Sequence, residues 1–198
     1  MDRSAERILE IAREQLLIRP RDLEAHGIAW EQIHRLHQAG KLRRVARGVY
    51  MLPDQPVSEN HSLALAIKQA PRAVVCLLSA LRFHDLTTQS PHEVWLAMPR
   101  NSVAPRIANP TIRLVKLSGA AFEEGVEQHE IDGVETPIYS AAKTVADCFK
   151  FRNKIGSDIA VEALRDALRR RVSIDEIDHY AQVCRVGNVM RPYLEATV

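Results

Sequence analysis

Short helix-forming segments alternate with glycine and proline along residues 1–52, and a basic stretch of β-forming residues closes the series. Apolar residues recur at helical spacing behind Ser4, which predicts an amphipathic helix over residues 4–17 with Ser4 as its N-cap. A second short helix is expected from Pro20 to a stop at Gly27, where glycine can adopt the left-handed conformation. A third helix is expected from about Trp30 to Ala39. Three short helices so closely spaced predict a helix-turn-helix arrangement.

The third helix is expected to stop at Gly40 and to lead directly into KLRRVARGVYML, residues 41–52. Leu42, Val45 and Tyr50 favour strands on either side of an Arg47-Gly48 bend, which predicts a short two-stranded hairpin. Three helices followed by such a hairpin make a winged helix-turn-helix. In that arrangement the third helix enters the DNA major groove, and the hairpin, or wing, reaches the backbone or a neighbouring minor groove.

The outward face of the third helix carries the side chains that could read bases. Arginine pairs with guanine and glutamine with adenine, so Gln32, Arg35 and Gln38 are base-reading candidates. The wing cations suit phosphates, and Trp30 is expected to be a half-buried packing residue beside this face. The candidate DNA-binding residues are Trp30, Glu31, Gln32, His34, Arg35, Gln38, Lys41, Arg43, Arg44, Arg47 and Gly48. Two alternatives do not involve DNA. The same residues could form an ordinary solvated surface, or they could belong to a module that binds a toxin protein.

A polar PDQP segment, Pro53 to Pro56, reads as a linker because proline cannot continue either neighbouring element. It predicts a winged helix-turn-helix domain over residues 1–53 and a second domain over residues 58–198. The second domain opens with an expected helix that ends at Gln69, with Ser58 as its candidate N-cap. Its β-rich runs, with a hairpin signal at Asp132-Gly133, predict about four or five strands. The fold class is α+β, with the winged helix followed by a mixed sheet and a helical C-terminal part.

The C-terminal helices are expected over residues 140–152, 157–170 and 188–196, and one more is expected to begin at the sequence SIDE, residues 173–176. Ser157 is a candidate cap, and Ser173 and Glu176 have the spacing of a capping box. These helices contain a second basic segment, since residues 143–171 hold eight Lys or Arg against four Asp or Glu. The cations either offset helix dipoles or form a second nucleic-acid surface. They are Lys150, Arg152, Lys154, Arg165, Arg169, Arg170 and Arg171.

Other features bear on compartment and catalysis. Cys76, Cys148 and Cys184 are widely spaced and are expected to be reduced core residues. The charged N-terminus and the lack of a long apolar run predict a cytoplasmic protein that does not enter a membrane. No metal site, cofactor or catalytic residue is expected. A metal-dependent nuclease attached to the winged helix is the alternative, although the strands EVWLAMP and TIRLVKL lack its usual acidic triplet.

Three segments resemble the AbiEi-type antitoxins of abortive-infection toxin-antitoxin operons. They are LHQAGKLRRVARGVYML, SALRFHDLTTQSPHEVWLAMP and TPIYSAAKTVADCFKFRNKIG, and they occur in the order of that family. The resemblance implies a DNA-binding repressor of its own operon. The operator is expected to be double-stranded DNA with inverted repeats, bound by a monomer or a dimer. The resemblance also implies that the C-terminal domain acts as antitoxin against a nucleotidyltransferase-like toxin, without requiring direct contact.

Overall fold

The computed structural model describes residues 3–24 and 26–196, and they divide into two compact units. The first unit contains residues 1–71, 105–111 and 130–136, and the second contains residues 72–104, 112–129 and 137–198. These units do not follow the predicted division at residues 53–58, because the segment up to residue 71 and two later segments join the first unit. A folding domain limited to residues 1–53 therefore stays a prediction.

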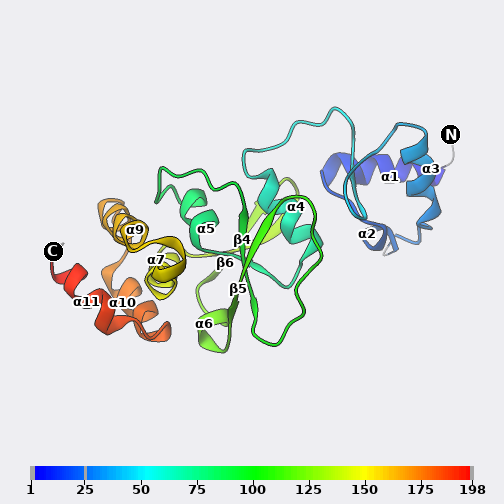
Figure 1. The fold of residues 1–198 in the computed structure, drawn as a ribbon. Coiled ribbons are helices and arrows are strands. Elements are labelled where there is room, and N and C mark those ends of the chain that lie inside the picture. The colour runs from blue at the N-terminus through cyan, green and yellow to red at the C-terminus, as the bar shows by residue number, and fades with distance from the viewer. Residues whose placement is uncertain (1–2, 25, 197–198) are drawn as a thin grey trace. The chain divides into compact units, whose positions relative to one another are not determined.

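The first unit holds the helices and wing of the N-terminal segment together with one more helix. Its elements are α1 (Arg3–Glu14), α2 (Pro20–Glu24), α3 (Glu31–Gln38), β1 (Arg43–Ala46), β2 (Val49–Met51) and α4 (His61–Gln69). Helices α1, α2 and α3 lie close to one another in this unit (Figure 1). They share an apolar interior that includes Ile8, Leu23 and Ile33. The predicted helix-turn-helix region is thus confirmed.

Two details at the start of this unit differ from the sequence predictions. Ser4 lies inside α1 instead of capping it, and the helix ends at Glu14 instead of residue 17. The reason for the early end is visible at Ile18, whose backbone exchanges two hydrogen bonds of 2.9 Å with Tyr50 of the wing. The chain leaves the helix to pair with β2, and Leu17 and Ile18 become fully buried beside it.

The second unit contains most of a five-stranded sheet and the C-terminal helices. Its elements are β3 (Val74–Val75), α5 (Leu77–Phe83), β4 (Val94–Pro99), β5 (Ile112–Leu117), α6 (Ala120–Glu123), β6 (Val126–Ile131), β7 (Val134–Tyr139), α7 (Ala141–Lys150), α8 (Arg152–Ile155), α9 (Ser157–Arg169), α10 (Ile174–Val183) and α11 (Gly187–Glu195). The strand order is β5-β4-β3-β7-β6. Strand β4 pairs antiparallel with β3 and parallel with β5, and β3 pairs parallel with β7. The α+β class and the mixed sheet are confirmed.

The turn between β6 and β7 follows the predicted Asp132-Gly133 signal. Both residues have positive φ, 52° and 70°, as a tight two-residue hairpin requires. This end of the hairpin belongs to the first unit, where the Asp132 carboxylate accepts a 2.6 Å hydrogen bond from His61 and another of 3.1 Å from the Ser58 amide. Ser58 was predicted to cap α4, and that was wrong, because α4 begins three residues later, at His61.

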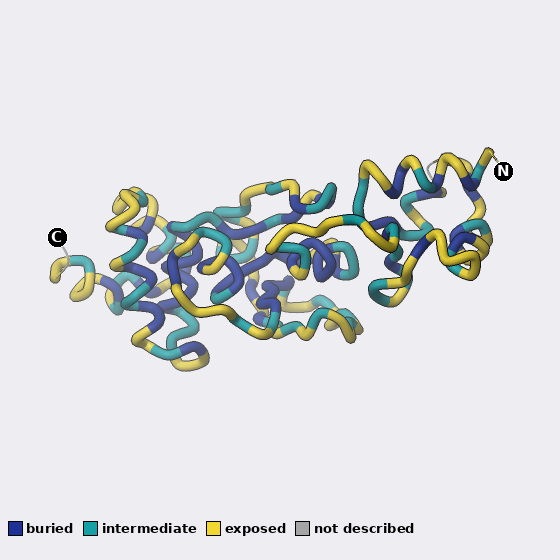
Figure 2. The backbone as a smooth tube through the Cα atoms, turned by 90° about the horizontal axis from the view of Figure 1, so that it is seen from above, coloured by how far each residue is buried: buried dark blue, intermediate teal, exposed yellow. Residues whose placement is uncertain are grey.

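Helix α7 lies at the centre of the second unit's interior. It contacts α5, α9 and α10, and eight of its ten residues are buried. In Figure 2 the buried stretches run through the inside of each unit and the exposed ones lie on its loops and outer helix faces. The three cysteines are free and buried, as predicted. Ser173 caps α10 as predicted, whereas Ser157 is the first residue of α9 and Gly156 is its N-cap.

Candidate nucleic-acid interface

The third helix is fixed in the first unit by its apolar side and by its C-terminal end. Ile33 and Leu36 are 1% and 5% exposed, as the helical projection predicted. At the end, Lys41 donates its amide to the Leu36 carbonyl at 2.9 Å and Gly40 donates to His37 at 3.0 Å. This is a Schellman ending, and it needs the left-handed φ of 70° that Gly40 adopts. The chain therefore turns sharply from α3 into the wing.

The opposite side of α3 presents polar side chains. Glu31, His34, Arg35 and Gln38 are exposed, and Gln32 is half-buried. Trp30 is the N-cap of α3 and is 59% exposed, so the expectation of a half-buried packing residue was wrong. Its indole lies at the helix start, where no neighbouring side chain covers most of it. The outer face thus combines a cation, amides and an uncovered aromatic ring.

The wing is attached to the helices from both of its strands. The Ile18 bridge supports β2, and the His37 Nδ1 lies 3.0 Å from the Leu42 carbonyl just before β1. The His37 ring also packs edge-on against Tyr50, with ring centroids 5.7 Å apart. These contacts hold the wing against α3 within the same unit, and His37 is used for packing.

The wing carries the predicted cations on its outside. Lys41, Arg43, Arg44 and Arg47 are exposed, and Gly48 completes the turn with a φ of 68°. Arg44 Nε donates to the Ala46 carbonyl at 3.2 Å, and an Arg43 guanidinium nitrogen lies 3.3 Å from the Met51 sulfur. Both contacts are made by guanidinium nitrogens, and both arginine residues remain exposed. The predicted candidates therefore belong to α3 and to the wing, two elements that contact each other through His37.

Some cations of the second basic segment donate hydrogen bonds to carbonyls at helix C-termini. Lys150 donates to the Cys184 carbonyl, the C-cap of α10, at 3.0 Å, and Arg152 donates to Phe149 near the end of α7 at 2.8 Å. Arg169 pairs with Asp166 on its own helix. The other four, Lys154, Arg165, Arg170 and Arg171, are exposed. A second nucleic-acid surface of seven cations stays a prediction, and three of its members have these structural partners.

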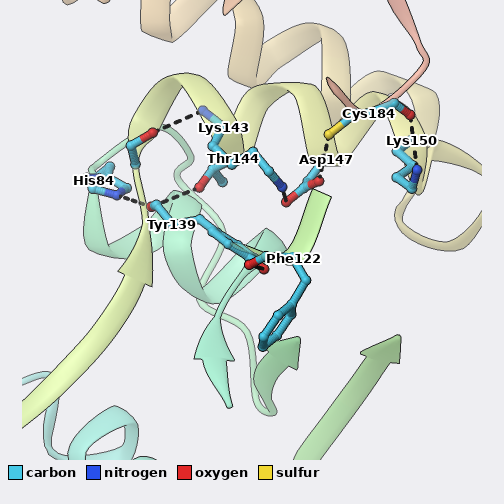
Figure 3. A network of polar contacts seen from close by, with 9 residues as sticks. His84, Phe122, Tyr139, Lys143, Thr144, Asp147, Lys150 and Cys184 are labelled. Atoms are coloured by element: carbon cyan, nitrogen blue, oxygen red, sulfur yellow. Dashed lines mark hydrogen bonds and ion pairs between the residues drawn. The ribbon is translucent and has the colours of Figure 1, made fainter. Parts of the chain in front are cut away.

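A buried polar network in the second unit was missed by the sequence analysis. Lys143 and Asp147, one turn apart on α7, are fully buried and form an ion pair of 2.6 Å (Figure 3). The other Asp147 oxygen accepts from the Cys184 thiol at 3.2 Å, and the Lys143 ammonium lies 4.1 Å from the centre of the Tyr139 ring. Burial raises the pKa of the Asp147 carboxyl, although Lys143 opposes that shift. The cost of burying these two charges is thus offset by the ion pair itself and by the contacts with Cys184 and Tyr139.

His84 belongs to the same region and is partly buried. Its Nε2 lies 2.8 Å from the Tyr139 carbonyl, which can only accept, so Nε2 carries a proton. Burial lowers the pKa of His84, while the hydrogen bond to Tyr139 and the Glu127 carboxylate act in the opposite direction.

The lowered pKa of His84 predicts a pH-dependent stability. Below about pH 6.5 the unfolded chain binds a proton that folded His84 does not, so the free energy of unfolding should fall as the pH decreases. His84→Gln keeps a hydrogen-bond donor for the Tyr139 carbonyl. It should reduce the slope of the free energy of unfolding against pH, measured by urea unfolding between about pH 7 and about pH 5.5. The exposed His92→Gln is the control and should leave it unchanged. An equal slope in His84→Gln and the natural chain would contradict this assignment.

The described residues contain neither a group of metal ligands nor a membrane-spanning helix. Across residues 3–24 and 26–196, no three histidine, cysteine or acidic side chains gather as metal ligands would. In the same residues no helix is both long enough and apolar enough to cross a bilayer.

Comparison with known proteins identifies the segment that carries this interface. Residues 6–53 match the family described as transcriptional regulator, AbiEi antitoxin. The fold is similar to the crystal structure of the RV2827C protein from Mycobacterium tuberculosis, with a TM-score of 0.61 and 15% identity over 90% of this chain and 71% of that one. A search of curated proteins gives no match. The resemblance predicted from the sequence is confirmed for its helix-turn-helix segment: residues 6–53 match the AbiEi antitoxin family of transcriptional regulators.

Proposed function

We propose that the chain binds double-stranded operator DNA through α3 and the wing and thereby represses its own toxin-antitoxin operon. The observation that carries the proposal is the arrangement of Arg35 and Gln38 on the outer face of α3, followed directly by the exposed wing cations. In a winged helix-turn-helix these positions correspond to base reading and phosphate contact, respectively. Repression follows sterically, because a protein that occupies the promoter blocks polymerase. Two copies on inverted half-sites would increase affinity.

In this proposal the chain is the antitoxin, and the toxin that it counteracts is a nucleotidyltransferase-like protein encoded beside it. The two proteins act against each other without a required stable complex. The primary experiment is retardation of DNA from the chain's own promoter, compared with unrelated DNA at the same salt concentration. Specific retardation without strand cleavage in the presence of Mg²⁺ supports a repressor. Cleavage would support the nuclease alternative, and toxin co-purification without DNA binding would support a protein-binding module.

Arg35 tests the reading role of α3. Arg35→Ala should cost about 1–3 kcal/mol at the cognate site and much less on unrelated DNA, because it removes a bidentate pair of hydrogen bonds to guanine. The measured quantity is the ratio of specific to nonspecific dissociation constants at one salt concentration. Arg44→Ala is the matched control and should weaken both to a similar extent, since phosphate contacts carry little sequence information. An unchanged ratio in Arg35→Ala would refute the assignment of α3 as the reading helix.

A further inference from the structure

A pocket of about 590 Å³ lies in the first unit beside the turn of the wing. Four separate stretches of chain meet there: the start of α2, the wing turn, the end of α4 and the loop of residues 105–111. Its lining residues are Arg19, Pro20, Arg21, Glu24, Arg47, Gly48, Gln69, Pro71 and Arg106. None of the sequence motifs predicts this site, because its members are brought together only by the fold.

The lining is strongly cationic. Four arginines face a single carboxylate, that of Glu24. Arg21, Arg47 and Arg106 are exposed, and no carboxylate of the described residues forms an ion pair with any of them. Like charges that converge on a concave surface repel each other and raise the local concentration of anions. The pocket is thus suited to a negatively charged group.

The fourth arginine, Arg19, is held in place by a small network. It donates to the Lys68 carbonyl and lies 3.5 Å from an Asp22 oxygen, while Lys68 pairs with the other Asp22 oxygen at 2.8 Å. Asp22 is therefore shared between two cations, and it does not neutralise the other three arginines. The Arg19 Nε is buried and has no hydrogen-bond partner among the described atoms.

The loop that carries Arg106 is fixed against the wing. Asn109 donates its side-chain amide to the Val45 carbonyl of β1 at 3.1 Å, and the Asn109 carbonyl accepts from Gln69 at 2.8 Å. These hydrogen bonds connect the loop to both the wing and α4. Arg106 is thereby kept beside Arg47 within one unit, which reduces the ordering cost of binding.

We propose that this pocket is a phosphate-binding site formed by Arg21, Arg47 and Arg106 around Arg19. Guanidinium groups match phosphate oxygens in geometry and can donate two parallel hydrogen bonds to them. The volume is in the range of small-ligand sites and admits more than one phosphoryl group. The phosphate comes either from a free phosphorylated ligand or from a DNA backbone that reaches past the wing turn.

Inorganic tripolyphosphate is the probe for the first source, measured by calorimetric titration of the full chain in low salt without DNA. The natural chain should bind it, and Arg21→Gln or Arg106→Gln should each weaken binding about tenfold by removing a charge-assisted hydrogen bond. Arg100→Gln removes an exposed arginine outside the pocket and should have no effect. Glu24→Gln removes the one lining carboxylate and should tighten binding. Circular dichroism verifies that each variant is folded.

The second arm measures DNA affinity of the same variants. If tripolyphosphate fails to bind but Arg106→Gln weakens DNA binding about tenfold and lowers the salt slope by about one, the backbone is the source. If neither ligand distinguishes the pocket variants from Arg100→Gln, the proposal is overturned. The first arm contains no DNA, so the pocket and the operator-binding proposal can fail independently.

Discussion

Lys143→Met is expected to lower the free energy of unfolding by about 3–5 kcal/mol, since it leaves the buried Asp147 carboxylate without its cation. Lys143 and Asp147 are each 0% exposed, and their 2.6 Å ion pair has no solvent to replace the missing partner. Urea unfolding followed by tryptophan fluorescence measures the effect. Trp95 is 3% exposed in the second unit and reports there, whereas Trp30 is largely exposed.

The matched control is the double variant Lys143→Met/Asp147→Leu. It removes both charges and should regain most of the stability, because apolar side chains can replace a buried ion pair at little cost. In the single variant the folded carboxyl binds a proton that the unfolded chain does not, so its stability deficit should shrink as the pH falls from about 7 to about 5. A decrease below about 1 kcal/mol in the single variant would contradict a buried, mutually dependent pair.

Removal of the wing charges is expected to have the largest effect on function. The triple variant Arg43→Gln/Arg44→Gln/Arg47→Gln should weaken DNA binding about a hundredfold or more near physiological salt. The slope of log affinity against log salt should decrease by roughly 0.9 for each phosphate that the wing no longer neutralises. Both quantities come from titrations at several salt concentrations.

The control for the wing variant removes the same charge elsewhere. Arg72, Arg82 and Arg191 are exposed residues of the second unit, and their replacement by glutamine should leave the slope nearly unchanged. An equal decrease in both triple variants would mean that net charge governs affinity. In that case the wing would have no special role.

Local turn chemistry made the N-terminal segment predictable from the sequence. Gly27, Gly40 and Gly48 all adopt left-handed φ values of 67–70°, so each glycine marks a real change of direction. The hairpin at Asp132-Gly133 was predictable for the same reason. Apolar spacing likewise placed Ile33 and Leu36 on the inner side of α3.

Long-range contacts account for what the sequence did not reveal. Lys143 and Asp147 have the spacing of a solvated ion pair on a helix surface, and only the packing of α7 among other helices makes them buried. The two-residue strand β3 exists because β4 and β7 flank it. The pairing of Ile18 with Tyr50 and the meeting of Arg106 with Arg47 likewise depend on partners far along the chain.

Site-directed DNA cleavage tests most directly whether α3 and the wing contact one duplex. An iron chelate attached to Gln38→Cys or Arg47→Cys would cut DNA near its own position, with Ser118→Cys, exposed in the second unit, as the control. The natural cysteines are buried, and burial raises the pKa of Cys184 to about 12, so they should resist labelling.

Both labelled proteins are expected to cut the same half-site, within roughly one helical turn, or about 10 base pairs, of each other. The Gln38 chelate should cut from the major groove and the Arg47 chelate beside the adjacent backbone or minor groove. Cleavage from only one of the two positions, or at unrelated sites, would contradict the claim that the helix and the wing bind one duplex together.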